Sequence, residues 1–180
     1  MRTLLRRRLA AAAGAIVLTS SSGCATSLHG LEFHNDKRLK ITFPHENELV
    51  TTPFTLRWTM RDFTVAEPGK GPVNDSTGYF AIFVDRSPIK PGRTLAAINQ
   101  SSPSCERSTL CTTKAYLARE QVYTTTANQL TLHSVADILS NKLSTQFHTA
   151  TVVLLNTAGE RFSESAWTIE FRMHSSGVND

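Results

Sequence analysis

Residues 79–84 read YFAIFV, an unbroken apolar run that ends at Asp85. Such a run is typical of a central strand in a β-sandwich. Residues 87–92 (SPIKPG) follow directly, and their two prolines exclude a regular helix or a central strand there. The chain therefore predicts a buried strand that gives way to a stiff turn.

Two other segments alternate strictly between apolar and polar residues. Residues 54–60 (FTLRWTM) and 167–173 (WTIEFRM) each keep this period of two, which predicts strands with one buried face. Trp58 and Trp167 belong to the apolar stripes, so we expect both to point inward. Weaker patterns predict further strands at residues 39–43, 49–50, 122–125, 129–133 and 149–155.

Helix is expected only in connectors. Residues 94–99 and 115–121 each suit a turn or two of helix, and residues 135–143 suit a short helix with Ser134 as its N-cap. Residues 62–76 are rich in Gly, Pro, Asn and Asp and predict a loop. The fold class predicted is mainly β, an antiparallel β-sandwich with one or two short connector helices.

This order of strands resembles an immunoglobulin-like or fibronectin type III-like domain. The resemblance covers residues 39–174 and rests on the first strands, the tryptophan inside the second long strand, the apolar strand after it and the terminal hairpin. It implies a rigid sandwich that carries function on its loops.

The N-terminus has the features of an export signal. The first eight residues contain four arginines, at positions 2, 6, 7 and 8, and a ten-residue apolar run follows at 9–18. This run is too short to span about 30 Å of hydrocarbon as a helix. Residues 1–23 are therefore predicted to be a signal peptide. The small residues that lead into Cys24 resemble a bacterial lipobox, and the alternative is ordinary cleavage nearby with Cys24 lost or free.

The lipobox resemblance implies that the Cys24 thiol is acylated and becomes the mature N-terminus. Residues 24–38 would then be the lipidated cysteine and a tether, residues 39–174 the sandwich, and residues 175–180 a tail. The expected location is the extracytoplasmic face of the cell membrane, where acyl chains anchor the exported protein to the bilayer.

The net charge of +4 belongs to this leader. The whole chain has 19 basic and 15 acidic residues, and four of the basic ones precede residue 9. Without them the charge is balanced, which argues against nucleic acid as a partner, because binding phosphates needs a positive field.

Cys105 and Cys111 form an even pair if Cys24 carries lipid, so we expect a disulfide between them. The ring is small, and it would stiffen one loop without joining distant strands. No neighbouring His or Cys completes a tetrahedral metal set around this pair.

The chain lacks the common catalytic motifs, including G-x-S-x-G, H-E-x-x-H and a glycine-rich phosphate loop. Its six histidines are scattered, and His133 and His148 are expected to face solvent or to be capped at strand positions. We therefore predict no catalytic residue, no metal and no cofactor.

The sequence favours a non-catalytic binding module that uses residues 86–121 as its recognition loop. The candidate contact residues are Arg93, Arg107, Tyr116 and Tyr123, and the expected partner is an envelope protein or a glycan. Two alternatives remain open: an envelope enzyme or enzyme accessory with a loop-built site of carboxylates and histidines, and a purely structural envelope spacer.

Overall fold

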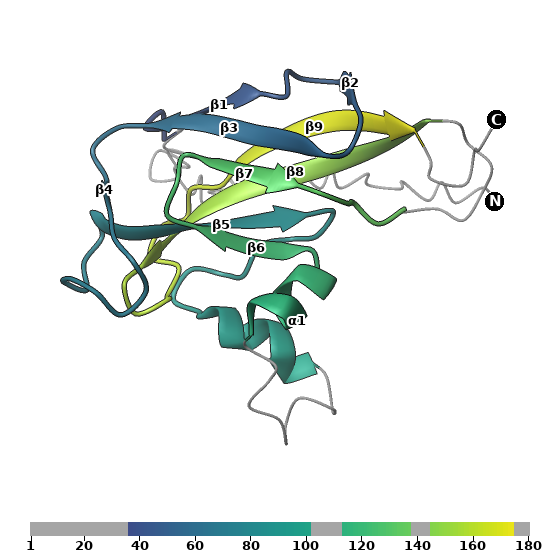
Figure 1. Cartoon of the computed structure of the whole chain (residues 1–180). Helices are drawn as coiled ribbons and strands as arrows, with labels where there is room; N and C mark the ends of the chain where they lie inside the picture. The colour runs from purple at the N-terminus through teal and green to yellow at the C-terminus, as the bar shows by residue number, and fades with distance from the viewer. Residues whose placement is uncertain (1–35, 102–112, 138–144, 175–180) are drawn as a thin grey trace, which may run out of the picture. The chain divides into compact units, whose positions relative to one another are not determined.

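The described residues of this computed structural model, 36–101, 113–137 and 145–174, form two β-sheets that face each other (Figure 1). One sheet has three strands, in the order β1 (Leu39–Phe43), β3 (Phe54–Met60) and β7 (Gln129–Leu132). The other has six, in the order β2 (Glu48–Val50), β9 (Trp167–His174), β8 (Thr145–Asn156) and β5 (Thr77–Val84), with β4 (Thr64–Val65) and β6 (Val122–Thr125) both paired to β5. The mainly β class is confirmed.

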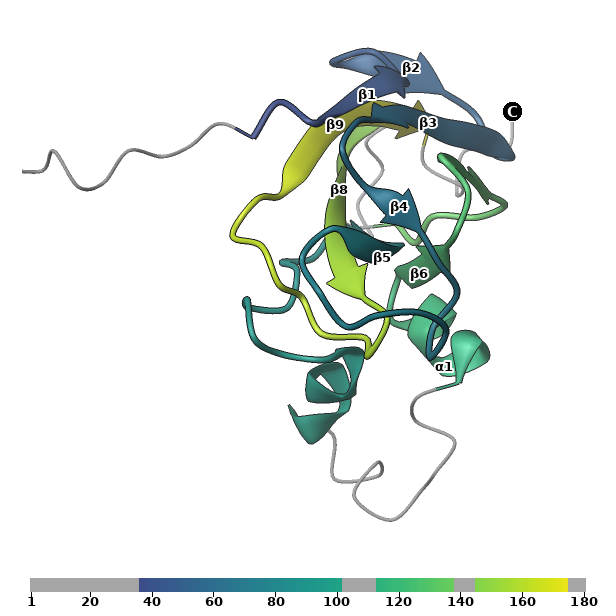
Figure 2. The ribbon, with the colours of Figure 1, turned by 90° about the vertical axis from the view of Figure 1, so that its left-hand side faces the viewer.

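The main core lies between the two sheets, and the larger sheet curls around it (Figure 2). The alternation in the sequence predicted the inward faces. Phe54, Leu56 and Trp58 are buried on β3, whereas Arg57 between them is exposed. Trp167 packs partly buried against the same core, so the predicted orientation of both tryptophans is confirmed.

Strand β5 is buried on both faces. Phe80, Ile82 and Val84 point into the main core, and the residues between them point to the outer side of the sheet. That outer side has a second apolar cluster, which β5 shares with residues of β6 and β8, with Ile89 and with Leu117. The unbroken apolar run thus reflects a third layer outside the two sheets.

The third layer contains both connector helices that were predicted between β5 and β6. The 3-10 helix η2 (Leu95–Ser101) places Leu95, Ala97 and Ile98 against the outer cluster, and α1 (Lys114–Arg119) contributes Leu117. The Thr113 side chain caps α1 by accepting a hydrogen bond from the Tyr116 amide at 3.3 Å.

Several sequence predictions need correction. Strand β2 pairs with β9, and β4 with β5, in parallel, so the sheets are not purely antiparallel. Strand β4 lies inside residues 62–76, which were predicted as a loop. Residues 135–137, the start of a predicted helix, are not helical, and residues 138–143 lie outside the described part.

Strand β8 begins at Thr145, four residues before its predicted start. Polar residues concealed this extension: Gln146 and His148 are buried and face inward, in the alternation that continues through Ala150. The search for apolar residues therefore predicted only the second part of β8, which is buried on both faces.

Asp36 fixes the first described residues to the sandwich. Its carboxylate accepts hydrogen bonds from the Arg38 guanidinium at 2.8 Å and from Ser165 Oγ at 3.0 Å, and its carbonyl accepts one from the Trp167 indole N–H at 2.7 Å. Residues 36–38, the end of the predicted tether, thus contact the start of β9.

Phe83→Ala tests whether the outer layer forms a true core. Phe83 is fully buried in the outer cluster, so its truncation should lower the free energy of unfolding by about 3–5 kcal/mol through lost burial and a cavity. Phe147→Ala in β8 is the matched control, because Phe147 is 56% exposed and its loss should cost little. Urea unfolding measures both, and equal losses would contradict a buried third layer.

Asp36→Asn should destabilise the protein in a pH-dependent way. The Arg38 guanidinium holds the pKa of the Asp36 carboxyl below its ordinary value of 3.8. A lowered pKa adds stability that is complete above the ordinary pKa and is lost as the pH falls through the folded-state pKa. The gap in unfolding free energy between wild type and variant should therefore be present at neutral pH and shrink in acid. A gap that stays constant from neutral pH to acid would show that the carboxylate charge contributes nothing.

Candidate functional site

Four hollows open around the segment that joins β5 to β6, residues 86–121, which we call the inserted segment. Each has at least one residue of this segment in its wall. We name them the seam hollow beside β6 (about 190 Å³), the Asp85 hollow (about 380 Å³), the basic hollow at residues 86–98 (about 480 Å³) and the threonine hollow at residues 124–126 (about 450 Å³). The inserted segment therefore contributes to the walls of all four of these hollows.

Arg161 attaches the start of the inserted segment to the sandwich. Its side chain is buried and donates to four carbonyl oxygens: that of Ile89 at 2.6 Å, and those of Ser163, Glu164 and Ser165 at 2.9, 2.8 and 3.2 Å. The backbone of Arg161 also exchanges hydrogen bonds with Gly92 and Arg93. The turn at residues 89–93 is thus held by both the side chain and the main chain of one residue.

Burial of the guanidinium lowers the pKa of Arg161 from its ordinary value, and the Glu164 charge partly offsets this effect. Arginine nevertheless stays protonated at neutral pH. A buried cation is stable only when its N–H groups are bonded, and here carbonyl oxygens replace the water that it loses. Sequence analysis did not predict this role, because Arg161 lies in a polar turn.

The basic hollow contains three cationic side chains, Arg86, Lys90 and Arg93, and no carboxylate is in its wall. Arg86 is oriented by Glu120, whose carboxylate and carbonyl accept its N–H groups at 3.0 and 2.8 Å. Arg93, a predicted contact residue, lies here. Arg107 and the cysteines 24, 105 and 111 fall outside the described residues.

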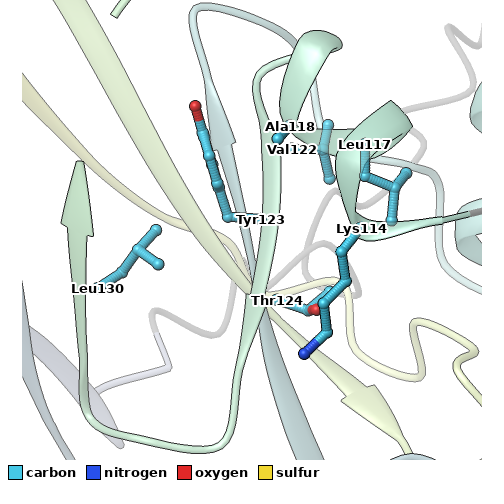
Figure 3. A pocket seen from close by; sticks show the side chains of 7 residues that line it. All are labelled: Lys114, Leu117, Ala118, Val122, Tyr123, Thr124 and Leu130. Carbon is cyan, nitrogen blue, oxygen red and sulfur yellow. The ribbon is translucent and has the colours of Figure 1, made fainter. Parts of the chain in front are cut away.

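The seam hollow lies between α1, β6 and β7 (Figure 3). Leu117 and Val122 form one wall and Leu130 of β7 the other, with Lys114 and Tyr123 at its margins. Burial raises the pKa of the Tyr123 hydroxyl, and the Gln121 side chain partly offsets this shift. Tyr123, a candidate contact residue, thus lines this hollow, whereas Tyr116, the other candidate tyrosine, is half-buried in α1 and does not line it.

A histidine–aspartate pair closes the end of β5. His148 Nδ1 lies 2.7 Å from Asp85 Oδ2, and Asp85 Oδ1 accepts the Thr149 amide at 2.8 Å. Asp85 has a positive φ of 53°, which ends the strand and turns its side chain back toward β8. Of the two arrangements expected for these histidines, His148 has the capped one and is 2% exposed, whereas His133 is exposed.

This pair bears on the enzyme alternative, which needs two titratable groups within hydrogen-bond reach in a pocket. Asp85 lines a hollow, but His148 does not, and its ring stacks on Phe171 with centroids 5.7 Å apart. A general base must reach the proton that it removes. The pair is therefore better placed to join β5 to β8 than to act on a substrate.

Among the described residues, no group of three or more His, Cys, Asp and Glu is placed to hold a metal ion. Within the same residues, no helix has the length and apolar character needed to cross a membrane. Comparison of the chain with family models, curated proteins and solved structures finds no match.

Arg161→Met should loosen the inserted segment. The methionine fills much of the same volume but leaves buried carbonyl oxygens without donors, so we expect a loss of about 3–5 kcal/mol in unfolding free energy. Amide exchange at Gly92 should also accelerate, because its acceptor is the Arg161 carbonyl.

The matched control is Arg172→Met. The Arg172 side chain donates from Nε to the Asn47 carbonyl at 2.8 Å on a partly exposed face, and its loss should cost less than about 1 kcal/mol. Similar losses in the two variants would contradict the special role of Arg161.

Proposed function

We propose that this protein is a lipid-anchored cell-envelope protein that works as a non-catalytic binding module. The inserted segment is its recognition surface. One observation carries the proposal: four hollows have residues of this segment in their walls, and Arg161 and Leu117 attach its two ends to the larger sheet. A surface that is ordered before binding loses less entropy when a partner arrives.

Charge supports the same surface. The inserted segment has six basic residues and two acidic ones, whereas the rest of the chain after residue 23 has nine basic and thirteen acidic. The net charge after residue 23 is thus balanced, but the inserted segment is positive and the rest of the chain is negative. Complementary charge speeds encounter and selects partners, so this segregation favours an acidic partner at the inserted segment.

The sandwich itself is proposed to be immunoglobulin-like. If β1, β3, β5, β6, β7, β8 and β9 are taken as strands A, B, C, C′, E, F and G, one sheet has the order A-B-E and the other G-F-C-C′. Immunoglobulin domains divide their strands in this way. Trp58 lies on strand B in this scheme, whereas antibody domains have their core tryptophan on strand C.

The proposed anchor is an acylated Cys24. Eleven residues would then separate Cys24 from Asp36, which bonds to Ser165 and Trp167. Ser165 also accepts from Arg161, which in turn bonds Ile89. These bonds link Asp36 to the start of the inserted segment, and the partner we expect is an envelope component held near the membrane.

The proposed disulfide, Cys105–Cys111, would shape the middle of the inserted segment. A ring of this size restricts a loop locally. Its contribution would be to affinity more than to stability, since Arg161 and the outer cluster already hold both ends of the segment.

Site-specific photo-crosslinking in the producing cells tests this function. A photoreactive residue would replace exposed Lys90 or Arg119 in the inserted segment, with exposed Lys40 on β1 and Thr59 on β3 as control positions. We expect one crosslinked envelope partner from positions 90 and 119, none from 40 and 59, and loss of membrane retention with Cys24→Ala.

Equal labelling from both sets would overturn the assignment of the surface. Labelling from neither set would favour the structural spacer. An unmodified residue other than Cys24 at the mature N-terminus would end the lipid anchor.

A further inference from the structure

Strands β6 and β7 are consecutive but belong to different sheets. Among the described strands, β6 pairs with β5 and β7 with β3, and neither has a partner on its other side. The turn between them is stabilised by Thr125, whose hydroxyl accepts from the Ala127 amide at 3.0 Å. The two strands therefore diverge and leave a seam between the sheets.

The ladder between β5 and β6 shows which backbone groups face this seam. The Val84 amide donates to the Gln121 carbonyl at 2.9 Å, and the register then pairs Ile82 with Tyr123. Every second residue of an antiparallel strand bonds to the same neighbour. Thr124 therefore directs its N–H and C=O to the free edge, and no described residue bonds to them there.

The seam hollow lies at this edge and not on a face of the sheet. Val122 points to the outer cluster and Tyr123 to the main core, yet both line the hollow. Figure 3 shows Leu130 and Tyr123 on one side of β6 and Leu117 and Lys114 on the other. Only a cavity at the strand edge contacts side chains of both orientations.

The threonine hollow extends the same groove. Thr124 and Lys114 line both hollows, so the groove continues past the seam hollow to Thr126. Glu67 lies at the far end, but its carboxylate is engaged by Lys70 at 2.6 Å. Lys114 is exposed and is the charge that both hollows share.

We infer that this groove receives an extended, acidic peptide segment of the partner, which adds to β6 as a strand. The inference rests on the proposed function and names the chemistry of its partner. The Thr124 backbone supplies a hydrogen-bonded pair, the seam hollow takes one apolar side chain, and Lys114 faces a carboxylate two residues along. Strand addition of this kind draws affinity from the main chain and specificity from alternate side chains.

Two observations favour a peptide over a small ligand. The seam hollow, at about 190 Å³, is smaller than the roughly 300–1,000 Å³ typical of ligand pockets, so it suits a single side chain. A small ligand would also leave the Thr124 edge unused. The acidic character follows from charge complementarity with Lys114 and with the positive inserted segment.

The test uses the purified full chain labelled with ¹⁵N. Two synthetic peptides serve as probes, acetyl-Thr-Val-Glu-Leu-Glu-Val-Thr-amide and the same peptide with lysine in place of glutamate. We expect the acidic peptide to bind about tenfold more tightly and to slow amide exchange at Thr124 by about tenfold or more. Lys114→Glu should remove the preference, whereas Lys40→Glu on β1 should not.

Thr124→Pro removes the N–H on the free side and should abolish binding, while its spectrum reports whether the fold survives. If that variant unfolds, strand addition is judged from amide exchange at Thr124 in the wild type and from the peptide preference of Lys114→Glu. No binding of either peptide up to about 1 mM, or binding that leaves the Thr124 amide unchanged, overturns strand addition. If a partner still crosslinks through positions 90 and 119 in that case, the proposed function stands and only this inference fails.

Discussion

The structure depends on the burial of β5 on both faces. All eight residues from Thr77 to Val84 are buried, and a two-sheet sandwich can cover only one side of them. The other side requires a further apolar layer, since leaving Phe83 and its neighbours in water would forfeit about 25 cal/mol for each Å² of apolar surface. The inserted segment supplies that layer and is therefore part of the fold.

This constraint explains why the described parts of this long connection, residues 86–101 and 113–121, have a defined position on the larger sheet. Leu117 and Ile89 attach its two described parts to the outer cluster, and Arg161 adds a polar attachment at residues 89–93. The exposed cations Lys90 and Lys114 are thereby presented from fixed backbone. A loop of similar length without these attachments would lose more conformational entropy on binding.

The sequence predicted the mainly β class and the inward faces of the long strands, because alternation reports burial directly. Strands β3 and β9 follow from the stripes that contain Trp58 and Trp167. It could not predict the third layer, since an apolar run shows that both faces are covered but not by what. The short helices were found, yet nothing in their composition linked Leu117 to Phe83, which lie far apart in the chain.

For the candidate site, too, some residues could be named from the sequence and others could not. Tyr123 and Arg93 were among the candidate contact residues, and both line hollows. Arg161 and Asp85 were missed as organising residues, because their roles come from tertiary contacts with Ile89 and His148. One pattern in the sequence could have predicted that His148 is buried: it lies two residues before Ala150, and therefore on the same inward face of β8.

An open edge next to a sandwich core is usually a hazard, because unpaired strands invite aggregation. The chain limits this hazard elsewhere: β2 and β4 have three and two residues, and β1 is interrupted by a register shift between Ile41 and Phe43. At β6 the edge is short, and α1 stands beside it with Lys114 exposed. One wall of the seam thus comes from the inserted segment and the other from the sandwich through Leu130. A strand that pairs with β6 there must fit its side chains against both walls of the seam. The inserted segment therefore gives selectivity to an edge that would otherwise pair with any extended chain.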